Sequence, residues 1–211
     1  AALDAASKGA VAAGVALGRV SRSDANRIVF VFPGHGSQWK GMGSELLSRE
    51  PVFREAMEQC ARAIRAGTGW CLIERLLSDD ADAALDQVDV VQPVLFAVQV
   101  GLSALWKSWG ILPDAVVGHS MGEVAAAHVA GALRLEDAAA VIVRRSRLLR
   151  RIVGEGKMAL VELSWSEAEQ AISGHTDRLS IAAGNGPRST VIAGEPHALA
   201  HVIGSLEEAG V

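Results

Sequence analysis

The sequence predicts an α/β protein in which helices cover a parallel sheet, followed by a smaller ferredoxin-like subdomain. Two short apolar runs, at residues 28–32 and 115–117, alternate with longer segments of helical periodicity, which is typical of a parallel sheet with helices on its faces. From Lys157 onward the order becomes strand, helix, strand, strand, helix, as in a ferredoxin-like unit that lacks its last strand. With 50% hydrophobic residues among 211, the chain can build a core and is not expected to be disordered.

These changes in pattern divide the chain into three segments. Residues 1–27 are small, polar and weakly periodic, and we interpret them as an interdomain linker. We expect residues 28–156 to form the large parallel-sheet subdomain. Residues 157–211 are expected to form the small subdomain, truncated at Val211 where its final strand should begin.

Both predicted strands of the large subdomain are short and apolar. Residues 28–32 form a continuous apolar run that ends at Pro33, and such a run is typical of a strand buried on both faces. Residues 115–117 form a second short strand, also predicted to be buried, which leads directly into a glycine-containing turn.

Two amphipathic helices are predicted between these strands. The first follows Pro51, carries its apolar residues on one stripe and ends at the Gly-Thr-Gly turn of residues 67–69. The second is predicted to begin at Pro93, because proline is tolerated in the first turn of a helix, and Gly110 ends it. A further helical stretch, residues 123–130, follows the second strand.

Three strands are predicted in the small subdomain, at residues 158–163, 179–183 and 189–193. A capping box from Ser166 to Glu169 predicts the start of a helix after the first of them. Pro196 begins the final amphipathic helix.

Charge, cysteine content and hydropathy exclude several classes of function. Lys and Arg number 20 against 24 Asp and Glu, without basic clusters, which argues against nucleic acid or an anionic membrane as the partner. No apolar run reaches about 18 residues, so we expect no membrane span and a cytoplasmic protein. Cys60 and Cys71 are too few for a disulfide scaffold or a zinc site. His197 and His201 lie four residues apart without an evident third ligand, so no metal is expected.

The strongest chemical signal is the segment Gly118-His-Ser-Met-Gly122, which lies between a predicted strand and a predicted helix. This is the context in which a nucleophile elbow lifts a serine hydroxyl above a sheet. Ser120 is therefore the candidate nucleophile. The N–H of Met121 falls at the N-terminus of the following helix, where an oxyanion is stabilised.

Arg145 is predicted to lie at the centre of an apolar helix face. At about 100° per residue, several apolar side chains fall within about 60° of it, whereas the neighbouring arginines fall about 100° or more away. The apolar residues are Val141, Ile142, Leu148, Leu149 and Ile152, and the other arginines are Arg144, Arg147, Arg150 and Arg151. A guanidinium in such a position needs an anionic or carbonyl partner. The pattern leaves two possibilities open, a substrate carboxylate held bidentately and an internal Asp or Glu.

The loop after the first predicted strand, residues 34–39, is a third candidate element. Loops at the carboxyl ends of parallel strands line the ligand crevice, so we expect this loop and the elbow to share one rim. A backbone N–H near Gln38 is then a candidate for the second oxyanion donor.

Five motifs occur in order and at fitting separations. They are Val31-Phe-Pro-Gly-His-Gly-Ser-Gln-Trp39, Val88-Asp-Val-Val-Gln92-Pro, Gly118-His-Ser-Met-Gly-Glu123, Arg145-Ser146 and Asn185-Gly-Pro-Arg-Ser-Thr-Val-Ile-Ala-Gly194. Together they resemble the acyltransferase domain of modular type I polyketide synthases, which is related to malonyl-CoA:acyl-carrier-protein transacylases. The resemblance runs from about residue 28 to the end, and residues 1–27 resemble the linker from an upstream ketosynthase.

The resemblance implies an α/β-hydrolase-like core and ping-pong acyl transfer. Ser120 would take the acyl group of an acyl-CoA extender unit and pass it to the phosphopantetheine thiol of an acyl carrier protein, with no cofactor bound by this domain. Arg145 matches the arginine that binds the extender's free carboxylate, which favours the substrate carboxylate as its partner. Gln38 and Met121 match the positions whose backbone amides form the oxyanion hole. The polar residues expected to line the site are Gln92, His119 and Asn185.

One departure from the family concerns the general base. In the family this base is a histidine on the strand that closes the small subdomain, a position that would fall beyond Val211. None of the six histidines of the chain matches it. We therefore expect the isolated chain to transfer acyl groups poorly or not at all.

The extender unit and two other classes of function stay open. Residues 87–92 resemble the sequence of methylmalonyl-selecting domains, so we predict methylmalonyl, with malonyl as the alternative. Met121 matches neither the glutamine usual for methylmalonyl nor the branched residue usual for malonyl. An α/β-type serine esterase or thioesterase shares the glycine–serine–glycine pattern. The other class is a catalytically incomplete fragment that serves as a docking module for the carrier protein.

Overall fold

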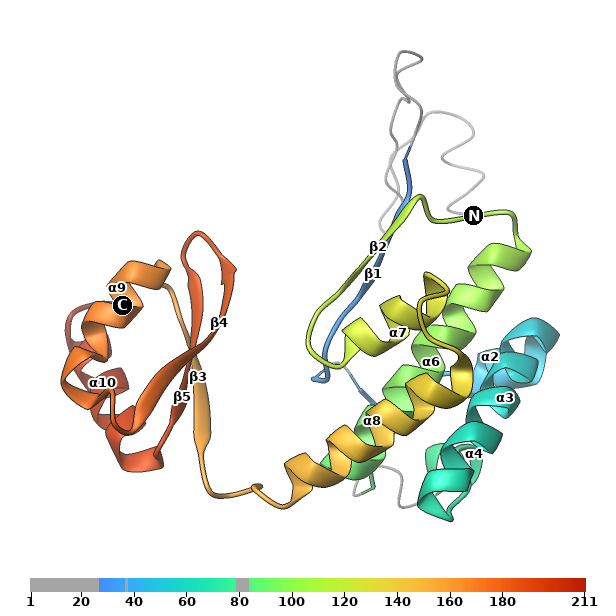
Figure 1. The fold of residues 1–211 in the computed structure, drawn as a ribbon, viewed down its shortest axis with the longest axis horizontal. Helices are drawn as coiled ribbons and strands as arrows, with labels where there is room; N and C mark the ends of the chain where they lie inside the picture. Colours follow the sequence, from blue (N-terminus) through green and yellow to red (C-terminus); the bar gives the residue numbers. More distant parts are fainter. Residues whose placement is uncertain (1–26, 37, 79–83) are drawn as a thin grey trace, which may run out of the picture.

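The computed structural model describes residues 27–36, 38–78 and 84–211. These residues form two lobes, which we call the large lobe (up to Arg150) and the small lobe (from Lys157), joined by residues 151–156 (Figure 1). Each lobe has a hydrophobic core of its own. Apart from its last residue, the predicted linker lies outside the described residues.

The large lobe contains a parallel pair of strands, β1 (Val29–Phe32) and β2 (Ala115–Gly118). The prediction that both strands are buried is wrong for the described residues. Val29 and Val31 are 49% and 68% exposed, and Val117, which pairs with Val31, is 54% exposed. Side chains alternate between the faces of a strand, so one face of the pair packs on the lobe and the other remains open. Strand pairing and burial on both faces are separate properties, and the apolar run predicted only the first.

Three helices follow β1, namely α2 (Ser44–Arg49), α3 (Pro51–Thr68) and α4 (Leu72–Leu77). The predicted apolar stripe of α3 is confirmed, because its buried residues are Phe53, Met57, Cys60, Ala61 and Ile64. The helix ends where predicted, at Gly69, whose φ of 80° is a left-handed conformation that favours glycine.

Helix α6 (Val88–Ser108) is the central helix of the large lobe and packs against α3, α7 and α8. The prediction that it begins at Pro93 is wrong, because Pro93 lies inside the helix. Burial of Val90 and Val91 in the core favours the earlier start and offsets the backbone hydrogen bond that proline cannot make. By length and composition α6 could cross a membrane, but 72% of its most apolar window is buried in the lobe.

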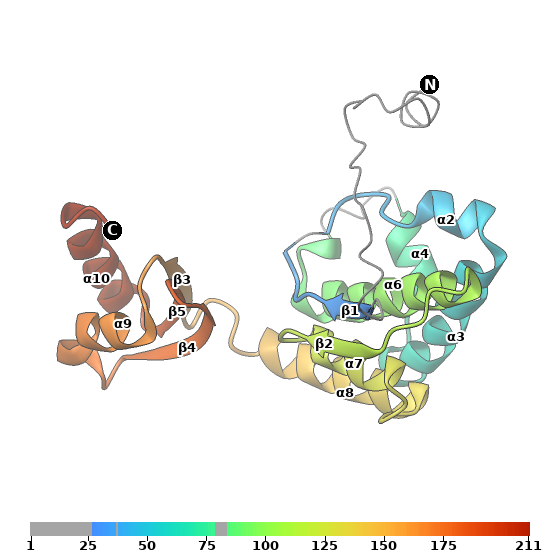
Figure 2. The same cartoon turned by 90° about the horizontal axis from the view of Figure 1, so that it is seen from above.

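Two helices complete the large lobe, α7 (Gly122–Val129) directly after β2 and α8 (Leu135–Arg150). Helix α7 confirms the helix predicted after the second strand. Helix α8 packs against α3 and α6, and its C-terminal end leads to the small lobe (Figure 2). The elements that carry the candidate site residues other than Asn185 therefore meet within the large lobe.

The small lobe is an antiparallel sheet with two helices and a short 3-10 helix. Its elements are β3 (Lys157–Val161), α9 (Trp165–Ala171), η1 (Ser173–His175), β4 (Leu179–Gly186), β5 (Ser189–Gly194) and α10 (Pro196–Glu208). The strand order β3-β5-β4 places the first strand beside the third, as in a split βαβ unit. The predicted order of elements is confirmed.

Helix α9 begins two residues earlier than predicted. The capping box is formed by Ser164 and Glu167, not by Ser166 and Glu169. Ser164 accepts from the Glu167 N–H, and the Glu167 carboxylate accepts from the Ser164 N–H at 2.7 Å. The sequence contains two overlapping Ser-x-x-Glu patterns, and the extended backbone of Ser164 selects the first. The Ser164 hydroxyl also donates to the Glu167 carboxylate at 2.6 Å, and this bond, together with that from the Ser164 N–H, holds the pKa of Glu167 below its usual value.

Candidate active site

Ser120 stands at the sharp turn between β2 and α7. Its φ of 54° lies in the left-handed region, and it is the one non-glycine residue with a positive φ in the part of the chain that the structure describes. A residue with a Cβ pays a steric penalty in this conformation, and such strain occurs at functional sites. The predicted nucleophile elbow is therefore present in the backbone itself.

The two glycines of the elbow are required by close packing of the backbone. A Cβ on Gly122 would lie 2.0 Å from the carbonyl oxygen of Phe32 in β1. A Cβ on Gly118 would lie 2.4 Å from the Cα of Glu123 in α7. Since real Cβ atoms do not approach so closely, any other residue would push the helix away from the strand. The glycines thus fix the position of the serine between them.

Met121 is fully buried and occupies the N-cap position of α7. Its backbone is therefore at the end of the helix where N–H groups and the helix dipole favour negative charge. This is the location that the oxyanion-donor assignment needs. The side chain packs into the core of the large lobe.

The loop after β1 lies against the elbow, as the parallel-sheet argument predicts. A Cβ on Gly34 would lie 3.4 Å from Nδ1 of His119 and 3.5 Å from Cβ of Ser120. The side chain of Gln38 folds back within the loop, where its Oε1 accepts a hydrogen bond of 2.9 Å from the Gly36 N–H. The assignment of the Gln38 backbone as oxyanion donor stays a prediction.

Arg145 reaches from α8 to the nucleophile. Its Nη2 donates to Oγ of Ser120 at 3.1 Å, and its Nη1 donates to Oε1 of Gln92 in α6 at 2.5 Å. Gln92 is fully buried. Three predicted site residues from three separate elements are thus connected by hydrogen bonds. Among the described residues Arg145 forms no ion pair, so the alternative of an internal carboxylate partner finds no support there.

The prediction that Arg145 lies at the centre of a buried apolar face is wrong in part. Val141, Leu148 and Ile152 are 45%, 58% and 55% exposed, whereas Ile142 is buried. Helix α8 instead buries the adjacent stripe against α3 and α6; its members are Ala138, Ala139, Ile142, Val143 and Ser146. Arg145 lies at the border of this stripe and is half-buried, so one side of its side chain remains accessible.

A hydrogen bond near the nucleophile joins the two lobes. Nε2 of His119 lies 3.2 Å from Oδ1 of Asn185, which is in β4 of the small lobe. An amide oxygen can only accept, so in this pair Nε2 of His119 carries the proton. The structure therefore brings His119 and Asn185, two of the three predicted lining residues, together at the Ser120 turn.

None of the other five histidines forms a hydrogen bond with Ser120 among the described residues. His128 binds the carbonyl oxygen of Leu133 at 3.0 Å, and the rings of His175 and His201 contact each other in the small lobe. No cluster of three potential metal ligands occurs in the described residues. His197 and His201 are both exposed in α10.

Gln99 is a residue near the site that sequence reasoning missed. Its Nε2 donates to the carbonyl oxygen of Pro33 at 2.8 Å, which ties α6 to the loop beside the elbow. Gln92 and Gln99 are seven residues apart on a mostly apolar helix, a spacing that places both on one face. That spacing was the available signal.

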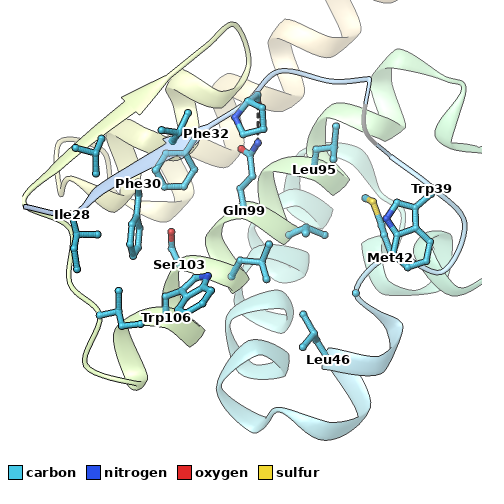
Figure 3. A pocket seen from close by; sticks show the side chains of 17 residues that line it. Ile28, Phe30, Phe32, Trp39, Met42, Leu46, Leu95, Gln99, Ser103 and Trp106 are labelled. Carbon is cyan, nitrogen blue, oxygen red and sulfur yellow. Dashed lines mark hydrogen bonds between the residues drawn. The ribbon is translucent and has the colours of Figure 1, made fainter. Parts of the chain in front are cut away.

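A separate apolar cavity of about 650 Å³ lies between β1 and α6. Phe30, Ser103 and Trp106 face it, and Trp39, Met42 and Leu46 close its other end (Figure 3). Neither Ser120 nor Arg145 lines it. The candidate active site therefore lies outside this cavity.

Comparisons with known proteins agree with the resemblance. A family model described as acyl transferase domain matches residues 29–211. Erythronolide synthase EryA2 of Saccharopolyspora erythraea is 52% identical over 191 residues, covering 90% of this chain and 5% of that protein. The acyltransferase domain from module 8 of the salinomycin polyketide synthase has 45% identity and a TM-score of 0.91, covering 99% of this chain and 49% of that structure.

A malonyl-transacylase solved in complex with a type II polyketide synthase acyl carrier protein is also similar. It has 27% identity and a TM-score of 0.77, with 88% of this chain and 60% of that one covered. The chain thus spans about half the length of the solved domains and a small part of the synthase. The α/β fold with a large and a small subdomain is confirmed by these structures.

Proposed function

The chain belongs to the acyl transferase family, in the group of modular polyketide synthase domains, and from this premise we propose that it is an acyl-CoA:acyl-carrier-protein acyltransferase. It would load an extender unit from acyl-CoA onto the phosphopantetheine thiol of an acyl carrier protein. The observation that carries this proposal is the contact of 3.1 Å between the Arg145 guanidinium and the Ser120 hydroxyl at a strained elbow.

The first half-reaction forms an acyl-enzyme on Ser120. The Oγ attacks the thioester carbonyl carbon, a C–O bond forms, the C–S bond breaks, and CoA leaves with the proton that a general base took from the serine. In the second half-reaction the carrier thiol attacks the ester and Ser120 recovers its proton. No cofactor takes part in either step.

Charge is stabilised at both ends of the bound acyl group. The N–H groups of Met121 and Gln38 are proposed to hold the oxyanion of each tetrahedral intermediate. Arg145 is proposed to bind the terminal carboxylate of the extender by charge-assisted hydrogen bonds. A half-buried cation within hydrogen-bond distance of the serine suits a short diacid, because a malonyl carboxyl carbon is three bonds from the ester oxygen.

The general base is proposed to come from outside these 211 residues. No histidine of the described part forms a hydrogen bond with the Ser120 hydroxyl, and His119 is engaged with Asn185. Gln92, His119 and Asn185 then line the site without removing the serine proton.

The finer assignments are methylmalonyl as the extender, with malonyl as the alternative, and a cytoplasmic synthase as the setting. Residues 28–156 and 157–211 are proposed as its large and small subdomains, and residues 1–27 as the linker to an upstream ketosynthase. The malonyl-transacylase complex with a carrier protein supports the proposed partner. One additional methyl group in an apolar pocket changes selectivity by only about 1–3 kcal/mol, so few side chains decide the extender.

The test is acyl loading of the full-length protein that carries this chain. Incubation with malonyl-CoA or methylmalonyl-CoA should add one acyl group at Ser120, detected by peptide mass spectrometry, and holo carrier protein should remove it. The matched variant Ser120→Ala should take up none. Loading that persists in Ser120→Ala would overturn the nucleophile assignment, and loading by residues 1–211 alone at the full rate would overturn the external base.

A further inference from the structure

Two polar bridges connect α6 to α8, and they differ in charge. Asp89 of α6 forms an ion pair with Arg150 of α8 at 2.5 Å. Three residues further along α6, Gln92 accepts a hydrogen bond from Arg145 at 2.5 Å. One arginine is therefore paired with an acid and the other with a neutral amide, across the same pair of helices.

The neutral bridge keeps the charge of Arg145 available. An amide oxygen fixes the direction of a guanidinium through Nη1 without cancelling its charge, whereas a carboxylate would neutralise it. Because Nη1 is held by Gln92, Nη2 is directed to Ser120 at 3.1 Å. An uncompensated cation beside the nucleophile can attract a substrate carboxylate.

Stability of the fold does not account for a glutamine at this position. Gln92 is fully buried, and its Nε2 has no hydrogen-bond partner among the described residues. A buried amide donor without a partner is destabilising, and an apolar side chain of similar shape would avoid that penalty. The contact with Arg145 is what the glutamine supplies.

We propose that Gln92 is a positioning and specificity-determining residue that aims the Arg145 guanidinium at the acyl site and, being neutral, reserves its charge for acyl groups with a terminal carboxylate. This inference rests on the proposed function of Arg145 as the carboxylate-binding residue. It adds that a carboxylate at position 92 would compete with the substrate for the same cation.

The test compares charged and neutral substrates in the full-length protein that carries this chain. The readout is the ratio of kcat/KM for methylmalonyl-CoA or malonyl-CoA to kcat/KM for propionyl-CoA, together with the melting temperature. Gln92→Glu should lower the ratio about tenfold or more, because the KM for the charged substrates rises more than that for propionyl-CoA. Gln92→Met should also lower the ratio and keep or raise the melting temperature.

Two controls separate the possible failures. Gln99→Met alters another buried glutamine of α6 that also has an unpartnered amide atom, and it should leave the ratio unchanged. Arg145→Ala should abolish the preference for charged substrates. If Arg145→Ala leaves the ratio intact, the proposed function fails and this inference fails with it. If Arg145→Ala lowers the ratio but the Gln92 variants do not, the inference on Gln92 is overturned and the proposed function stands. The same holds if the Gln92 variants lower kcat/KM equally for charged and neutral substrates.

Discussion

Nη2 of Arg145 donates a hydrogen bond of 3.1 Å to Oγ of Ser120, although the two residues are 25 positions apart in the chain and on either side of α7. The serine is held by the β2–α7 turn, and the arginine by α8 and its contact with Gln92. Cation and nucleophile are thus placed independently by the backbone and meet without an intervening acid among the described residues.

Replacing Arg145 with alanine should discriminate between substrates by charge. Loss of charge-assisted hydrogen bonds to a carboxylate is expected to lower kcat/KM for malonyl-type CoA esters by about 10- to 100-fold, with little change for propionyl-CoA. Steady-state kinetics in the full-length protein measure this. Arg147→Ala, on the exposed side of the same helix, serves as the control. An equal loss for both substrates would favour a simple esterase.

The strain at Ser120 predicts a difference between two inactive variants. Ser120→Ala keeps the left-handed φ of 54° with a Cβ present, whereas Ser120→Gly removes the steric penalty. Since glycine also makes the unfolded chain more flexible, we expect Ser120→Gly to be up to about 1 kcal/mol more stable than Ser120→Ala. Denaturant unfolding of both variants tests it, and a less stable glycine variant would contradict the strain.

Position 122 should not tolerate any residue other than glycine. Gly122→Ala would place a methyl group 2.0 Å from the Phe32 carbonyl oxygen, so β1 and α7 must separate. We expect a loss of about 3 kcal/mol or more in unfolding free energy, together with loss of acyl loading. The matched control is Gly204→Ala in α10, where a Cβ meets nothing within 4 Å; that variant should gain about 0.5–1 kcal/mol.

The hydrogen bond between His119 and Asn185 should restrain the two lobes. A hydrogen bond contributes about 0.5–1.5 kcal/mol net. We therefore expect Asn185→Ala to increase several-fold the fraction of molecules in which the two lobes are separated. The connecting segment offers an exposed trypsin site at Arg151, and cleavage there should accelerate accordingly. Asn185→Asp retains the acceptor oxygen and should cleave at the original rate. Equal rates for all three proteins would show that this bond does not limit opening.

The buried thiol of Cys60 should make stability fall at high pH. Burial raises the pKa of Cys60 from 9.0 to about 12. The folded state therefore keeps the proton while the unfolded state loses it, so the stabilising difference is complete below pH 9 and is lost between pH 9 and about 12. At pH 10 the expected loss is about 1 kcal/mol relative to pH 8.

Urea unfolding at the two pH values measures this change, and Cys60→Ala should remove it. In the native protein an alkylating reagent should react with the half-buried Cys71 and not with Cys60. Rapid native labelling of Cys60 would show that the helix α3 face opens far more often than its burial implies.

The candidate site could be predicted where short-range sterics decide the structure. The elbow depends on residues 118–122 alone, because two glycines and a strand–helix context leave one conformation for the serine. The stripe of α3 was equally readable, since its buried residues repeat with the helical period.

Other features depend on partners far along the chain and could not be read locally. The exposure of Val31 follows from which elements cover the sheet, and the start of α6 before Pro93 follows from the packing of Val90 and Val91. The bridge from Gln99 to the Pro33 carbonyl connects positions 66 residues apart. Periodicity gives the type of an element but not the neighbour that each of its faces meets.

The contact between Gly122 and the Phe32 carbonyl has a consequence for re-engineering substrate choice. Main-chain atoms, not the side chains that surround the acyl group, determine where the reactive oxygen stands. Substitutions at the lining positions can therefore be used to change which acyl group is accepted, because they leave the position of the Ser120 hydroxyl unchanged.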